Sequence, residues 1–94
     1  MYADVKEREI EQEAIQTYGA QSQIIVAIEE LSELIKELTK HLRGEDNLNH
    51  ISEEMADVRI MLEQLDIMFG NSYSVDVWKY KKITRLAERL HNKE

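Results

Sequence analysis

Apolar side chains recur at steps of three and four residues over two long stretches of the sequence. The first stretch holds Ile24, Ile28, Leu31, Ile35, Leu38 and Leu42, and the second holds Ile51, Met55, Val58, Leu62, Leu65 and Phe69. This spacing places side chains on one stripe of an α-helix. We therefore predict two amphipathic helices whose stripes belong to the protein core.

The breaks between helices are predicted at the three glycines, Gly19, Gly44 and Gly70, because each stands in a polar stretch. The sequence has no proline, and the segments between the glycines are mostly good helix formers without the alternation of a half-buried strand. The two amphipathic helices should form an antiparallel hairpin across Leu42 to Asn47, with Asp46 or Asn47 as the N-cap of the second.

A further helix is predicted on each side of this hairpin. The first spans roughly Ala3 to Tyr18 and, having few large apolar residues, should be the most loosely packed. The last begins at about Ser74 and should pack through Ile83, Leu86, Ala87 and Leu90. Residues 1–94 are thus predicted to form a single all-α domain, a four-helix bundle.

A bundle of 94 residues has a limited core, yet the third helix has a second apolar edge at Met61 and Met68. Such an edge favours further burial between subunits. We therefore expect a homodimer or a homotetramer.

The charge balance excludes one class of partner. Lys and Arg number 12 against 19 Asp and Glu, a net charge of -7, whereas a protein that binds nucleic acid polymers needs a positive surface. The absence of cysteine fits a reducing compartment, no apolar run is long enough to span a membrane, and the N-terminus is too charged for a secretory signal. We expect a soluble cytoplasmic protein without a membrane partner.

Two similar acidic strings stand on the two arms of the predicted hairpin: EELSE at residues 29–33 and EEMAD at residues 53–57. Glu30 and Glu33 form an i, i+3 pair, as do Glu54 and Asp57, so each pair places two carboxylates side by side on its helix. Glu54 and Asp57 also border apolar side chains, where a carboxylate is costly without a compensating cation. An all-oxygen set of this kind suits Mg²⁺ or Mn²⁺.

A solvated helix face is the alternative interpretation of these acids. In a sequence with 19 acidic residues, a single string of this type is typical of a solvated face. Two such strings on adjacent arms, one of them beside an apolar edge, are less expected by chance, so the pattern alone leaves both a metal site and a solvated face open.

The stretch from Gln21 to about Gly70, with its E-E-x-x-E and E-E-x-x-D strings, resembles the all-α nucleoside triphosphate pyrophosphohydrolases of the MazG-like superfamily. The resemblance implies Mg²⁺-dependent cleavage of a nucleoside triphosphate between its α and β phosphates, giving a monophosphate and pyrophosphate. It implies the metal ligands Glu30, Glu33, Glu54 and Asp57. The leading acids of the strings, Glu29 and Glu53, would lie at or near the site, where either could orient or deprotonate the attacking water.

The last predicted helix concentrates positive charge in an otherwise acidic chain. Lys79, Lys82 and Arg85 are candidate phosphate-binding residues, because a departing pyrophosphate needs cationic neutralisation beyond its metal. Trp78 could stack on a base, although core or interface packing is the commoner role. The alternative for the cations is a solvated basic helix end.

Two functional classes follow from these patterns. The first is a nucleotide pyrophosphohydrolase that acts in nucleotide-pool control or house-cleaning, with a phosphoribosyl-ATP pyrophosphohydrolase as a variant within the same fold. The second is a non-catalytic acidic helical bundle that binds a partner protein through its apolar edges. The preferred base and sugar are left open.

Overall fold

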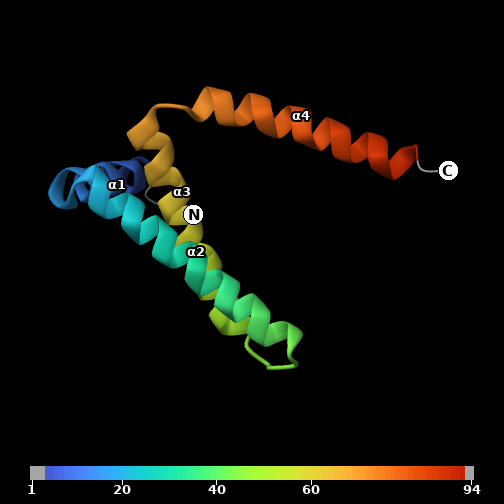
Figure 1. The fold of residues 1–94 in the computed structure, drawn as a ribbon. Coiled ribbons are helices and arrows are strands. Elements are labelled where there is room, and N and C mark those ends of the chain that lie inside the picture. The colour runs from blue at the N-terminus through green and yellow to red at the C-terminus, as the bar shows by residue number, and fades with distance from the viewer. Residues whose placement is uncertain (1–3, 93–94) are drawn as a thin grey trace.

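The computed structural model describes residues 4–92, which form four α-helices and contain no β-strand. The helices are α1 (Asp4–Tyr18), α2 (Ala20–Leu42), α3 (Leu48–Phe69) and α4 (Ser72–His91) (Figure 1). The predicted all-α class with four helices is confirmed. The predicted start of the first helix, Ala3, lies outside the described residues. None of the described helices has the length and apolar character needed to cross a lipid bilayer.

The glycines separate the helices as predicted. Gly70 ends α3 in the left-handed conformation, with φ 57° and ψ 36°, and its N–H donates to the carbonyl of Asp66. Glycine adopts this conformation without the steric cost of a Cβ atom. The chain can therefore turn sharply from α3 into α4.

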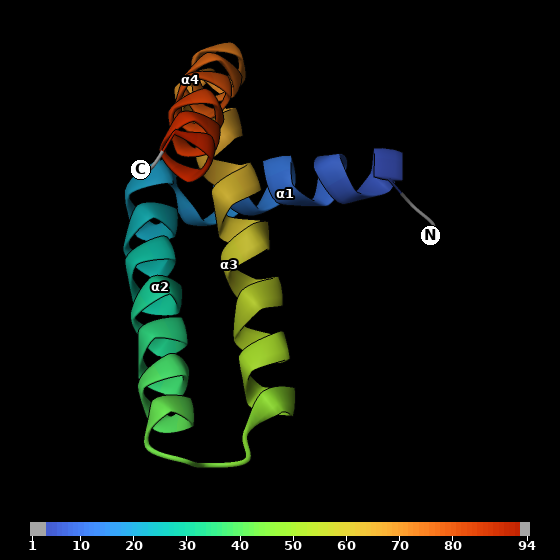
Figure 2. The same ribbon diagram turned by 90° about the vertical axis from the view of Figure 1, so that its right-hand side faces the viewer.

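The predicted hairpin of α2 and α3 is confirmed, and its two arms lie side by side (Figure 2). Polar contacts join the arms at both ends. Gln23 Nε2 donates to Gln64 Oε1 at 2.7 Å near the open end. Near the connecting loop, Asn47 Nδ2 donates to the carbonyl oxygen of Glu37 at 2.9 Å and to Glu37 Oε1 at 2.8 Å. Asn47 is the N-cap residue of α3, but its side chain caps no backbone N–H, so the predicted capping bond is wrong.

The predicted core stripe of α2 does not face α3. The α2 residues that are buried or half-buried on that side are Gln23, Ala27, Glu30, Leu34 and Glu37. The residues of the apolar stripe come one position later in the sequence than these contact residues, so the stripe is rotated by about 100° around the helix axis from the side that faces α3. The exposed residues of the stripe are Ile28, Leu31, Ile35, Leu38 and Leu42. The small side chain of Ala27 and the polar pairs at both ends allow α2 to use this other face. Apart from the half-buried Ile24, the stripe is therefore surface in the single chain.

On α3, the prediction is right for part of the stripe. Ile51 and Val58 are buried, together with Met61 from the second apolar edge. Met55, Leu62 and Phe69 are exposed. Because the arms are antiparallel and both exposed stripes follow the contact positions by one residue, they lie on the same side of the hairpin. We call this surface the apolar face: Ile28, Leu31, Ile35, Leu38 and Leu42 of α2 with Met55, Leu62 and Phe69 of α3.

The helices at the two ends differ from expectation. Helix α1, predicted to be the loosest, packs against both α2 and α3, and Ile10 and Ala14 lie near Ile60 of α3. Helix α4 does not pack to a similar extent against any of the other three helices. It extends away from the hairpin, on the side opposite α1 (Figure 1). Of its predicted packing residues, Ile83, Leu86 and Leu90 are exposed and Ala87 is half-buried, so α4 is the least packed helix.

The single chain is more open than a compact domain. Its radius of gyration is 16.5 Å, against about 12 Å for a compact domain of this length. It exposes 7849 Å² of surface, whereas a compact monomer of this size exposes about 5,700 Å². The difference, about 2,000 Å², lies in the range that each subunit of an obligate dimer buries.

Candidate metal site

Three of the predicted acids come together between the arms of the hairpin. Glu30 lies on the face of α2 that packs against α3, and Glu54 and Asp57 lie one turn apart on α3. Each offers a carboxylate oxygen, and these oxygens lie within 4.8 Å of one another. All three side chains are half-buried. The hairpin thus forms a three-carboxylate group that a hard divalent cation could bind.

The electrostatics of this group are unfavourable without a cation. Partial burial, followed by the negative charges of Asp57 and Glu54, raises the pKa of Glu30 above its ordinary value. Within the described part of the chain, Glu54 Oε1 is buried and has no hydrogen-bond donor. A bound cation would satisfy this oxygen and offset the repulsion. Since protons compete for the same oxygens, metal affinity should fall as the pH is lowered.

The other predicted acids lie outside the three-carboxylate group. Glu33 is exposed, three residues after Glu30 and rotated away from α3. Glu29 and Glu53 are also exposed. Glu53 Oε1 lies 4.0 Å from His50 Nδ1, one turn earlier on α3. The structure therefore assembles three of the four predicted ligands and leaves the leading acids at the surface.

The predicted phosphate-binding residues lie on α4, away from these acids. Lys79, Lys82 and Arg85 are exposed. The Lys82 ammonium lies 5.9 Å from the centre of the Trp78 ring, and the Lys81 ammonium lies 5.1 Å from it. Because α4 does not pack on the hairpin, these cations do not approach the three-carboxylate group of their own chain.

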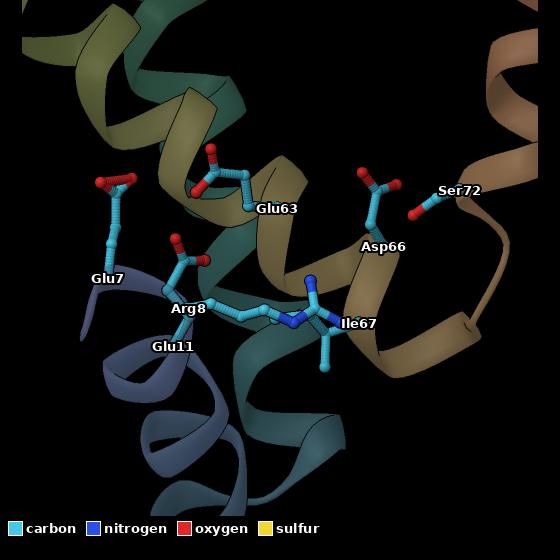
Figure 3. Close-up of a pocket in the computed structure, with 7 residues that line it drawn as sticks. All are labelled: Glu7, Arg8, Glu11, Glu63, Asp66, Ile67 and Ser72. Carbon is cyan, nitrogen blue, oxygen red and sulfur yellow. The ribbon is translucent and has the colours of Figure 1, made fainter. Parts of the chain in front are cut away.

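A second acidic group was not predicted. Glu7 and Glu11 of α1 and Glu63 of α3 also offer carboxylate oxygens within 4.8 Å of one another (Figure 3). In the sequence, Glu7 and Glu11 belong to a highly charged segment that is typical of a solvated helix, and Glu63 is one of 19 acidic residues. No local signal distinguishes them, because only the packing of α1 on α3 brings them together.

Neither a protein-family model, nor a curated protein, nor a solved structure matched this chain in the three comparisons. Its function is therefore inferred from its residues and their arrangement.

Proposed function

We propose that this protein is a Mg²⁺-dependent nucleoside triphosphate pyrophosphohydrolase of the MazG-like kind, acting on nucleotides in the cytoplasm. The observation that supports the proposal best is the three-carboxylate group of Glu30, Glu54 and Asp57. It unites acids from both strings, and the strings are the part of the sequence that resembles this superfamily.

The donor set fits Mg²⁺ or Mn²⁺. Oxygens that coordinate one Mg²⁺ ion at about 2.1 Å lie roughly 3–4 Å apart, and the three carboxylates need only small side-chain adjustments to reach that separation. Glu30 would hold the ion from α2, and Glu54 and Asp57 would hold it from α3. When bound, such an ion polarises the α-phosphate and lowers the pKa of a water molecule beside it.

Exposed glutamates near the group are available for the remaining tasks. Glu33 lies one turn from Glu30 and could join the ligand set by a change of rotamer. Glu29 and Glu53 remain the candidates to orient or deprotonate the attacking water. Glu53 Oε1 lies 4.0 Å from His50 Nδ1, and both side chains are exposed.

The phosphate-binding cations would come from a second copy of the chain. Lys79, Lys82 and Arg85 lie on α4, which does not pack on the hairpin of its own chain. The apolar face of that hairpin is exposed in the single chain, and its burial by a second copy would be favourable. A homodimer, or a homotetramer built from such dimers, would cover this face and could bring one copy's α4 toward the other's acids. Two acidic strings and a triphosphate concentrate negative charge, which cationic side chains would reduce.

Neutral replacements on α4 test this part of the proposal. We expect Lys82→Met and Arg85→Gln each to lower kcat/KM by an amount equivalent to about 1.5–3 kcal/mol, the magnitude of a charge-assisted hydrogen bond. Mn²⁺ binding without nucleotide should be unchanged, since neither residue lies in the three-carboxylate group. The comparison variant is Lys81→Met on the same helix. A kcat/KM within about twofold of wild type in both variants would show a solvated basic face instead.

The exposed apolar face also favours a second candidate function, a non-catalytic helical protein that binds a partner protein. One experiment separates the two. The protein is incubated with Mg²⁺ and a panel of ribo- and deoxyribonucleoside triphosphates that includes phosphoribosyl-ATP, and the release of pyrophosphate is measured. The enzyme should turn over at least one substrate, and only when Mg²⁺ is present. A binding protein should release no pyrophosphate from any of them.

A further inference from the structure

The second acidic group lies at the junction of α1 and α3, apart from the site proposed for catalysis. Glu7 and Glu11 stand one turn apart on α1, and Glu63 lies six residues beyond Asp57 on α3, about 9 Å further along the helix axis. Their carboxylates gather at one end of a cavity of 370 Å³ (Figure 3). The cavity borders the exposed Glu7 and Glu63 side chains, whereas Glu11 Oε1 itself is buried.

Glu11 differs from an ordinary surface glutamate. It is only 5% exposed, and its Oε1 atom has no hydrogen-bond partner within the described residues. A buried carboxylate oxygen without a donor costs free energy, and a ligand bound to this oxygen would offset that cost. A cation is the ligand that suits an oxygen surrounded by two further carboxylates.

The side chains that face Glu11 do not supply this compensation. Burial raises the pKa of Glu11 to about 8. A hydrogen bond with the Glu63 side chain and the negative charges of Glu63 and Glu7 act in the same direction, while the Arg8 guanidinium acts against them. Arg8 extends toward Asp66 on the other side of the cavity (Figure 3). The ordinary pKa of this carboxyl is 4.5. Folding therefore favours its protonated form, and this contribution to stability is lost as the pH rises from about 4.5 to about 8.

We propose that Glu7, Glu11 and Glu63 form a second site for a hard divalent cation, which ties α1 to α3. Three carboxylates and no imidazole or thiolate make an oxygen-only donor set, which favours Mg²⁺, Mn²⁺ or Ca²⁺ over Zn²⁺. A divalent ion would bind Glu11 Oε1, the buried oxygen that has no partner within the described residues. Because the ligands come from two helices, its binding would hold α1 on the hairpin.

The experiment uses the full chain with the first acidic group removed by Glu54→Gln and Asp57→Asn, so that the second site is read alone. Mn²⁺ is titrated calorimetrically at pH 7.5, and amide hydrogen exchange of α1 is followed with and without Mn²⁺. We expect about one Mn²⁺ ion per chain and slower exchange in α1 when Mn²⁺ is present. The wild-type protein should bind at least one Mn²⁺ ion more than this background. The background therefore reports on the second site, and the difference from wild type reports on the three-carboxylate group.

Adding Glu11→Gln to this background should weaken Mn²⁺ binding at least tenfold and remove the effect on α1 exchange. Glu13→Gln is the matched control, because Glu13 is exposed on the same helix. Glu63→Gln, which changes the α3 side of the site, should act like Glu11→Gln, and circular dichroism checks that each variant is folded. The proposal is overturned if the background binds no Mn²⁺, or if its Mn²⁺ binding survives both Glu11→Gln and Glu63→Gln.

Discussion

Replacing Glu54 by Gln, or Asp57 by Asn, is expected to abolish Mg²⁺-dependent release of pyrophosphate. Each change keeps the volume of the side chain and removes a carboxylate from the group formed with Glu30. We expect a loss of at least about 10³-fold in kcat, equivalent to roughly 4 kcal/mol, because the group that would hold the ion is incomplete. Steady-state kinetics with the best triphosphate of the panel measures the effect, and circular dichroism should show unchanged helix content.

Two comparison variants make this result specific. Glu45→Gln removes an exposed acid in the loop between the arms, outside the three-carboxylate group, and should leave kcat unchanged. Glu33→Gln tests the fourth predicted ligand, which is exposed in the single chain. A loss as large as that of Glu54→Gln would mean that Glu33 turns into the site when metal and substrate bind. Wild-type turnover in Glu54→Gln or Asp57→Asn would refute the metal assignment.

Replacing Ile35 by Asp is expected to convert the protein from an oligomer to a monomer. Ile35 is 64% exposed in the single chain and lies in the middle of the apolar face. An aspartate there costs the isolated chain little, but its burial in an interface costs about 3 kcal/mol or more, which weakens a dimer at least about 100-fold. Light scattering or sedimentation at micromolar concentration distinguishes the two states.

The control for this change is Ser22→Asp, which adds the same charge to an exposed α2 position on nearly the opposite side of the helix from the stripe. This variant should remain oligomeric. A wild-type protein that is a stable monomer at micromolar concentration would contradict the proposed association. It would also favour a different partner for the apolar face, as the binding-protein interpretation requires.

The helices and their order were predictable because the signals are local. Helix-forming segments, the lack of proline and three glycines in polar stretches specify where helices begin and end. The short connection between the two amphipathic segments allows only an antiparallel hairpin. Glu54 and Asp57 could also be identified, since an i, i+3 pair of acids beside apolar residues is visible along a single helix.

The choice of helix faces was decided by tertiary packing. Periodicity shows that a stripe is apolar, but it does not show what covers the stripe. The arms meet through Ala27 and through the polar pairs Gln23–Gln64 and Glu37–Asn47. This packing turns Glu30 toward α3 and leaves the apolar stripe exposed.

Tertiary packing likewise separated residues that look equivalent in the sequence. Glu30 and Glu33 belong to the same string, yet one joins the three-carboxylate group and the other remains exposed. Glu11 is one of 19 acidic residues. Its burial depends on α3, whose Glu63 lies 52 positions later in the sequence. Burial and contact between distant segments are properties of the folded chain, because the energies that create them come from neighbours that are remote in sequence.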